Sequence, residues 1–224
     1  LRLALPGDKP RRALDIGCGA GLSTAALQPF TSHAVGLEPA VSMLAWHSSI
    51  APQSDFLAAR AETLPFPAAT FPLLTAAGSL NYVHHLPSFF AEAARVLTPG
   101  GELLVYDFSV GRAPFLEPWL AAFHQRFPPP ASEALYLDPH VLSTLHPAFR
   151  LQRAESFRLP LRLSRSFYLN YMLTETNVAA AVRRGTPLRE IRDWCASTLE
   201  AIWPADDAEI HFPGYYAFLG PTAA

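Results

Sequence analysis

Three glycines and one acid lie within the stretch LDIGCGAGLS (residues 14–23), between an apolar run and the start of a helical pattern. A glycine-rich turn that opens a helix brings a ligand close to backbone N–H groups at the positive end of the helix dipole. The glycine spacing does not follow G-x-G-x-x-G, and no G-K-[ST] follows it, so neither phosphate-binding pattern applies. Asp15 adds a carboxylate, which repels a pyrophosphate and attracts an ammonium or sulfonium group. We therefore expect a ligand that is cationic beside Gly17 and Gly19.

A second acid, Glu38, ends the next apolar run, 38 − 15 = 23 residues after Asp15. An acid about 20 residues beyond a glycine turn is placed to bind the two hydroxyls of a ribose. A third marker is RAETLPFP (residues 60–67), where the Ala61 N–H suits an adenine edge and the Glu62 carboxylate suits an exocyclic amine. Together these markers predict a nucleoside with a positive centre. The alternatives are a purely structural turn and solvent-exposed acids, and the second applies most to Glu62.

Short apolar runs alternate with helical patterns through the first half of the chain. The expected strands are residues 12–16, 33–37, 54–59, 73–77 and 102–108, and the expected helices are residues 22–28, 41–47 and 87–97. The last helix carries apolar residues at i, i+3, i+4 and i+7, and TPGG (residues 98–101) is expected to end it and form a turn. Strands that alternate with helices indicate βαβ units in a parallel sheet with right-handed crossovers.

The motifs DIGCGAG, GLEP, AETLPFP and RVLTPGGELLV follow one another in an order and spacing that resemble the class I S-adenosylmethionine-dependent methyltransferases. The resemblance is closest to the small-molecule group called type 11, with a hint of the trans-aconitate methyltransferase branch, and it covers residues 12–108. It implies an α/β fold with a Rossmann-like, mostly parallel seven-stranded sheet, an antiparallel last strand and helices on both faces. It also implies that S-adenosylmethionine is the cofactor and S-adenosylhomocysteine the product.

Carried over position by position, the resemblance implies a set of cofactor-binding residues. Asp15 would lie near the methionine ammonium, directly or through water, Glu38 would hold the ribose hydroxyls, and Gly78 would lie beside the methionine. The glycine loop would pass under the methionine and ribose, and the AETLPFP motif would frame the adenine. The residues in this set are Asp15, Gly17, Cys18, Gly19, Glu38, Pro39, Ala61, Glu62 and Gly78.

Two positions depart from the family pattern. Arg60 stands where many relatives carry an acid, which leaves Glu62 alone to recognise the adenine amine, and Pro72 stands where many relatives carry Asp. Proline lacks a backbone N–H, and a strand tolerates it at its first residue or at an edge. Cys18, read from the sequence alone, is a small apolar filler rather than a nucleophile, because no base is paired with it.

The base or positioning group for the acceptor is expected among His84, His85, Tyr82, Asp107 and Tyr171. The two adjacent histidines in NYVHHLP diverge on any regular element, so we expect no metal site there. Asp107 ends the fifth strand, where it is either a base or a cap for the next turn. Tyr171 belongs to an aromatic stripe at helical spacing, which is either core or the roof of a pocket. A carboxylate acceptor needs no base at all.

After residue 109 the alternation stops, and the chain is expected to divide into three parts. Residues 1–109 form the cofactor-binding core, residues 110–147 form a helical insertion that closes over the acceptor, and residues 148–224 complete the sheet with a second helical insertion at about 164–203. Within the later parts, we expect strands at residues 149–161 and 209–219 and helices at residues 139–145, 166–174 and 188–202.

Composition limits the classes of partner. The 224 residues carry a net charge of −2, and neither half of the chain is a basic module. The chain also reads AGSL where nucleic-acid methyltransferases carry N-P-P-[YF], so we expect no nucleic acid partner. No run approaches the roughly 20 apolar residues of a membrane span. The two cysteines suit a reducing cytoplasm. We therefore expect a cytoplasmic monomer or homodimer that methylates an oxygen, nitrogen or carbon nucleophile, or a carboxylate, on a small molecule.

Two rivals share most of these features. An NAD(P)-dependent oxidoreductase on a related fold also uses a glycine turn followed by an acid. A protein that holds the cofactor without turnover would keep the same cofactor residues. The sequence alone leaves both open.

Overall fold

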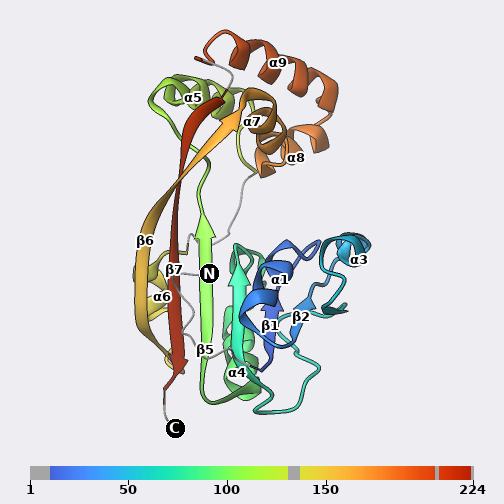
Figure 1. Cartoon of the computed structure of the whole chain (residues 1–224), viewed down its shortest axis with the longest axis vertical. Helices are drawn as coiled ribbons and strands as arrows, with labels where there is room; N and C mark the ends of the chain where they lie inside the picture. The colour runs from blue at the N-terminus through green and yellow to red at the C-terminus, as the bar shows by residue number, and fades with distance from the viewer. Residues whose placement is uncertain (1–10, 131–136, 205–206, 223–224) are drawn as a thin grey trace. The chain divides into compact units, whose positions relative to one another are not determined.

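The computed structural model describes residues 11–130, 137–204 and 207–222. One seven-stranded sheet runs through it in the order β3-β2-β1-β4-β5-β7-β6 (Figure 1). The strands are β1 (Ala13–Ile16), β2 (Ala34–Leu37), β3 (Asp55–Leu57), β4 (Phe71–Ala77), β5 (Leu97–Phe108), β6 (Phe149–Ser164) and β7 (Asp207–Pro221). The pairings from β3 through β5 are parallel, and β7 is antiparallel to β5. The expected mostly parallel, seven-stranded sheet is confirmed.

The helices lie close to where the periodicity predicts, with four differences. They are α1 (Leu22–Leu27), α2 (Val41–Leu44), α3 (His47–Ile50), α4 (Leu86–Val96), α5 (Glu117–Arg126), α6 (Pro139–Thr144), α7 (Arg165–Met172), α8 (Thr176–Arg183) and α9 (Leu188–Glu200), with short 3-10 turns at Gln28–Phe30, Leu80–Tyr82 and Pro114–Leu116. The single helix expected at 41–47 is instead the two short helices α2 and α3. Helix α8 was not expected. Helices α7 and α9 each end two residues before their predicted ends at 174 and 202.

Alternate residues of the central strands feed two separate apolar cores, because successive side chains point to opposite faces of a sheet. Leu14 of β1 packs with α4 through Phe90 in one core, while Ala13 packs with α1 through Leu27 in the other. Helices therefore cover both faces, as the fold expectation requires. Strands β1 and β2 are buried along their whole length, which is typical of the centre of a parallel sheet.

The TPGG stretch lies inside β5 as an irregularity rather than before the strand. Between two successive pairs with β4, Phe71↔Leu97 and Leu73↔Glu102, β4 advances two residues while β5 advances five. Pro72 lies in this same irregular stretch, one residue before Leu73, the first residue of β4 that pairs with β1. Proline has no backbone N–H to donate to a neighbouring strand. It is tolerated at position 72 because the regular pairing of β4 begins one residue later, at Leu73.

The chain divides into two compact units. The first comprises Leu1–Phe108, Ala134–Ser156 and Gly214–Ala224, and the second comprises Ser109–Glu133 and Phe157–Pro213. The expected insertion at 110–147 is thus split between them, because Leu142 of α6 is buried in the core of the first unit, whereas Trp119 and Phe123 of α5 belong to a core of the second. In the described part of the chain, no helix has the length and apolar character needed to cross a membrane.

Candidate functional site

A pocket of about 680 Å³ opens in the first unit at the carboxyl ends of β1, β2 and β4. Strands β2 and β3 lie on one side of β1, whereas β4 and all later strands lie on its other side. The direction in which the sheet grows therefore reverses between β1 and β4. Open α/β sheets bind ligands at such a switch point. Sequence-predicted residues that line the pocket are Gly17, Gly19, Glu38, Pro39, Ala61, Glu62, Gly78 and His84.

The turn after β1 requires glycine for both conformational and steric reasons. Gly17 and Gly19 have φ values of 65° and 56°, in the left-handed region that side chains disfavour. A Cβ on Gly17 would lie 2.6 Å from the Cβ of Ser79, and a Cβ on Gly19 would lie 3.2 Å from the terminal methyl of Met43. The loop therefore approaches its neighbours as closely as a bare backbone allows.

Backbone donors in this loop are already bonded within the protein. The N–H groups of Gly17 and Cys18 donate to the carbonyl of Leu37 at 2.8 and 3.1 Å. The next N–H, that of Gly19, donates to Oε2 of Glu38 at 3.1 Å. A phosphate cradle needs such donors free and aimed at the ligand. The loop thus provides a close backbone surface, but these three groups offer no donor to a pyrophosphate.

Glu38 presents acceptors to the pocket. It is 8% exposed, its Oε2 accepts from Gly19, and its Oε1 accepts from the N–H of Ala40 at 2.9 Å. Two carboxylate oxygens accept about four hydrogen bonds in all, so two further acceptor positions remain. Because these oxygens are held side by side at the pocket wall, they are suited to a pair of neighbouring hydroxyls.

Asp15 lies behind the pocket and does not line it. Its carboxylate is fully buried, with Oδ2 accepting from the hydroxyls of Ser23 at 2.5 Å and Thr24 at 2.7 Å, and Oδ1 accepting from Thr75 at 2.9 Å. Burial raises the pKa of Asp15 above its ordinary value, although the three hydroxyls oppose this. The structure therefore does not place Asp15 against a cationic ligand group. The carboxylate instead ties β1 to α1 and β4.

Cys18 also lies outside the pocket lining. Its side chain packs against the bare Cα of Gly36, where a Cβ would come within 2.8 Å of the sulfur. Burial, together with the charges of Asp15 and Glu38, raises the pKa of the thiol to about 12. The thiol is therefore neutral near pH 7, which fits its interpretation as a small apolar filler.

Glu62 joins two walls of the pocket. Its Oε1 accepts from the N–H groups of His84 at 3.0 Å and His85 at 3.4 Å, and its Oε2 lies 3.8 Å from Nε of Arg60. Partial burial raises the pKa of Glu62, but the backbone N–H donors and Arg60 outweigh it and hold the pKa below its usual value. The carboxylate is thus ionised and partly occupied by the loop after β4.

Comparisons with known proteins agree with this geometry. Residues 14–105 match the family described as a methyltransferase domain. Over these residues the chain is similar to the class I S-adenosylmethionine-dependent methyltransferases of the type 11 group. The matched segment runs from β1 into β5 and contains every residue that lines the pocket.

Individual relatives are similar over part of their length. The uncharacterized methyltransferase YcgJ of Bacillus subtilis is 31% identical over 111 residues, which cover 47% of this chain and 44% of that protein. A demethylmenaquinone methyltransferase of Beutenbergia cavernae is 31% identical over 148 residues, covering 66% of this chain and 60% of that protein. The chain thus spans about half the length of the curated relatives it matches.

A solved structure shows that the fold likeness extends over nearly the whole chain. A proposed type II methyltransferase from Anaeromyxobacter dehalogenans superposes with a TM-score of 0.74 at 23% identity, covering 94% of this chain and 89% of that one. At this identity the likeness concerns the fold alone.

The expected catalytic residues occupy different settings. His84 lines the pocket. His85 does not, because its Nδ1 accepts from the N–H of Ser88 at 3.2 Å and caps the start of α4. Tyr171 lies in the second unit, in ring contact with Tyr168 and Phe212 at centroid distances of 6.0 and 5.5 Å.

Asp107 adjoins the pocket through Gly78. A Cβ on Gly78, whose φ is 58°, would lie 2.9 Å from Oδ1 of Asp107. The same oxygen accepts from the N–H of Phe108 at 2.7 Å. This contact corresponds to one of the two alternatives for Asp107, a cap for the turn after the strand rather than a base. Burial raises the pKa of the Asp107 carboxyl above its usual range.

Tyr82, one of the residues expected as a base or positioning group, lines the pocket. Two further lining residues were not expected from the sequence: Met43, which is 46% exposed, and Ser79, which donates to the carbonyl of Ile16 at 2.6 Å. Exposed apolar side chains in short helical turns carry no signal that separates them from ordinary surface. Within residues 11–130, 137–204 and 207–222, no cluster of three or more His, Cys, Asp or Glu is arranged to hold a metal ion.

Proposed function

We propose that this chain is an S-adenosylmethionine-dependent methyltransferase that acts on a small-molecule acceptor. The observation that carries the proposal is the pair of Glu38 oxygens at the pocket wall, beside a glycine loop in which the N–H groups of Gly17, Cys18 and Gly19 are already bonded. Ribose hydroxyls donate to a carboxylate, whereas a pyrophosphate would meet that negative charge without the N–H donors it needs. The site thus fits a nucleoside without phosphates.

Different residues of the pocket would contact different parts of the proposed cofactor. Glu38 would hold the ribose, the segment at Ala61 would lie against the adenine, and Gly17, Gly19 and Gly78 would face the methionine side. A volume of about 680 Å³ lies inside the range of roughly 300–1,000 Å³ that small-molecule sites occupy. Pro39 completes the wall beside Glu38, while Asp15 and Cys18 support the loop from behind.

When bound, S-adenosylmethionine supplies an electrophilic methyl group on a sulfonium. The protein then has to orient an acceptor in line with that group at about 3–3.5 Å, to exclude water, and to take a proton where the acceptor is a hydroxyl or an amine. His84 at the pocket wall is the first candidate for the base, and Asp107 beside Gly78 is the second. Tyr171, together with the helical segments at 110–147 and 164–203, remains a proposed contributor to acceptor binding.

The acceptor is proposed as a class rather than a compound. Oxygen, nitrogen and carbon nucleophiles and carboxylates all remain compatible with the pocket. Because a relative is named as a demethylmenaquinone methyltransferase, quinone-type acceptors are the first to try. We further propose a cytoplasmic monomer or homodimer.

Calorimetry tests the proposal against both rivals. Purified protein is titrated with S-adenosylhomocysteine and, separately, with NADH and NADPH. We expect saturable binding of S-adenosylhomocysteine only. Binding of a nicotinamide nucleotide alone would overturn the proposal in favour of an oxidoreductase. If S-adenosylhomocysteine binds, the protein is next incubated with S-adenosylmethionine and a panel of small metabolites. Release of S-adenosylhomocysteine then identifies a methyltransferase, and its absence identifies a binding protein without turnover.

A further inference from the structure

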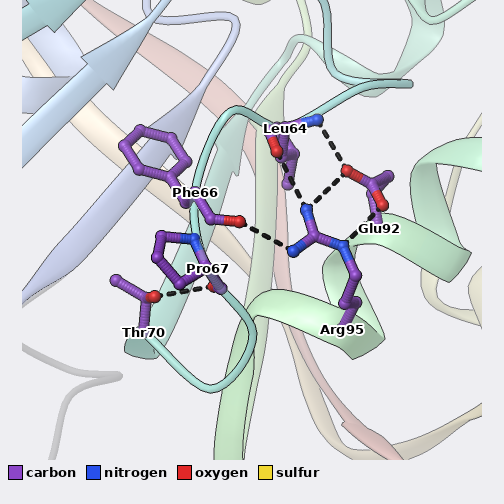
Figure 2. Close-up of polar contacts among 6 residues, drawn as sticks. All are labelled: Leu64, Phe66, Pro67, Thr70, Glu92 and Arg95. Atoms are coloured by element: carbon purple, nitrogen blue, oxygen red, sulfur yellow. Dashed lines mark hydrogen bonds and ion pairs between the residues drawn. The ribbon is translucent and has the colours of Figure 1, made fainter.

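We propose that Arg95, held by Glu92, is a positioning residue of the cofactor site that fixes the wall carrying Ala61 and Glu62. This inference rests on the proposed function. Both side chains belong to α4 and lie outside the pocket lining. Figure 2 shows the arrangement, in which the Arg95 guanidinium lies between Glu92 and the loop that passes over it.

The Arg95 side chain makes contacts in two directions. Its Nη1 donates to the carbonyl of Phe66 at 2.7 Å, and its Nη2 donates to the carbonyl of Leu64 at 2.9 Å. Toward its own helix, Nε and Nη2 each donate to one oxygen of Glu92 at 2.7 Å. Glu92 in turn accepts from the N–H of Leu64 at 2.7 Å. The two side chains therefore bind three backbone groups of one loop, all drawn in Figure 2.

The loop depends on these contacts because it lies outside regular structure. Residues 58–70 connect β3 to β4, so their backbone groups have no strand or helix ladder to join. Unpaired backbone groups that lose water must find other partners. Side chains of α4 supply partners at Leu64 and Phe66, and the backbone of α4 supplies them nearby, since the N–H of Ala69 donates to the carbonyl of Arg95 at 2.9 Å.

The support is rigid because α4 is fixed in the core. Its residues Phe89, Phe90, Ala93 and Val96 are fully buried. Glu92 and Arg95 are three residues apart, so they lie on the same side of the helix, and each holds the other's rotamer. The hydrogen bond from Arg95 lowers the pKa of Glu92, which keeps this acceptor ionised.

The Glu92–Arg95 pair, which we call the clamp, binds the loop only a few residues away from the part that lines the pocket. Leu64 is three residues after Ala61 and two after Glu62, both of which line the pocket, and its own side chain is buried in the core. A guanidinium is a planar fork that binds two carbonyls and a carboxylate at once, which an ammonium cannot reproduce. Arg95 therefore sets the path of the wall that we assign to the adenine.

The test measures recognition of the adenine, which a merely structural role would not change selectively. Arg95→Leu, Arg95→Lys and the wild type are titrated with S-adenosylhomocysteine and with S-inosylhomocysteine, in which an oxygen replaces the exocyclic amine. Arg112→Leu is the matched control, since Arg112 also makes a 2.7 Å ion pair, with Glu117 in the second unit. Thermal unfolding is recorded for every variant.

We expect Arg95→Leu to weaken S-adenosylhomocysteine binding about tenfold or more, and to bring the affinities for the two ligands closer together. Arg95→Lys should lie between Arg95→Leu and the wild type, and Arg112→Leu should bind both ligands as the wild type does. If Arg95→Leu does not fold, Arg95→Lys decides by the same two measurements: its affinity for S-adenosylhomocysteine relative to the wild type, and the ratio of its affinities for the two ligands.

Equal weakening for both ligands, or unchanged affinity in a folded Arg95 variant, would overturn the clamp. A wild type that binds neither ligand would instead overturn the proposed function, so the two failures are distinguishable.

Discussion

Oε2 of Glu38 accepts a hydrogen bond from the N–H of Gly19 at 3.1 Å, which joins the end of β2 to the loop after β1. This bond has two effects. It removes a donor that a pyrophosphate would use, and it holds a carboxylate at the pocket wall with acceptor capacity left over. The distinction between a phosphate-free nucleoside and a dinucleotide therefore depends on this contact.

Glu38→Gln tests that distinction directly. The glutamine NH₂ group must face a backbone N–H of either Gly19 or Ala40, so a donor would oppose a donor. We expect S-adenosylhomocysteine to bind about tenfold or more weakly, as measured by calorimetry. Glu209→Gln, which changes an exposed acid of the second unit, is the control and should bind normally. Unchanged affinity in Glu38→Gln would show that the carboxylate is not a ligand.

Gly17→Ala tests the close approach of the loop. The substitution places a side chain at φ 65° and within 2.6 Å of the Cβ of Ser79. The conformational part alone should cost about 1–2 kcal/mol in the free energy of unfolding, and the contact adds to it. Urea denaturation measures the loss. Ser79→Gly relieves the contact but also removes the hydrogen bond from Ser79 to Ile16, so the double variant Gly17→Ala/Ser79→Gly is compared with Ser79→Gly alone, relative to which it should show only the conformational cost. Full stability in the Gly17→Ala variant would contradict the geometry.

Asp15→Asn tests the buried carboxylate through its pH dependence. Because burial raises the folded-state pKa of Asp15, folding favours its protonated form. The stability that the protonated group contributes is complete below the unfolded-state pKa and is lost as pH rises through the folded-state pKa. We therefore expect the wild type to lose stability relative to Asp15→Asn as pH rises from acid toward neutral. Urea denaturation of both proteins across that range measures this difference, and a difference that moves the other way would contradict the assignment.

His84 and His85 are adjacent, yet they should respond differently to substitution. His85→Ala removes the acceptor that caps α4, which should cost about 1 kcal/mol and leave turnover near normal. His85→Asn keeps an acceptor and should restore most of that stability. His84→Ala should leave stability nearly unchanged and, where His84 is the base, lower kcat by about 10²–10⁴. Thermal unfolding and steady-state kinetics, once an acceptor is found, separate the two; the reverse pattern would exchange the roles.

The sequence predicted those residues of the pocket lining that depend on local spacing. Gly17, Gly19 and Glu38 carry their chemistry in short motifs after strands, and the strands themselves are marked by apolar runs. The alternation of strands and helices likewise predicted the sheet. Such features need no knowledge of distant contacts.

The remaining features depend on partners that are far apart along the chain. The contact between Thr75 and Asp15 joins residues 60 positions apart and exists only because β1 pairs with β4 in one register. Arg95 reaches Phe66 across 29 positions. In the sequence it is the first residue of the RVLTPGGELLV motif, but the motif does not indicate which backbone groups the side chain binds. The division of residues 110–147 between two units also depends on tertiary burial, which periodicity does not encode.

A crystal structure of the protein with S-adenosylhomocysteine tests the central claim most directly. We predict that the two ribose hydroxyls lie within about 2.6–3.0 Å of the Glu38 carboxylate oxygens, with the Gly17–Gly19 backbone against the homocysteine side. A ribose bound away from Glu38, or a ligand seated elsewhere in the protein, would contradict the account.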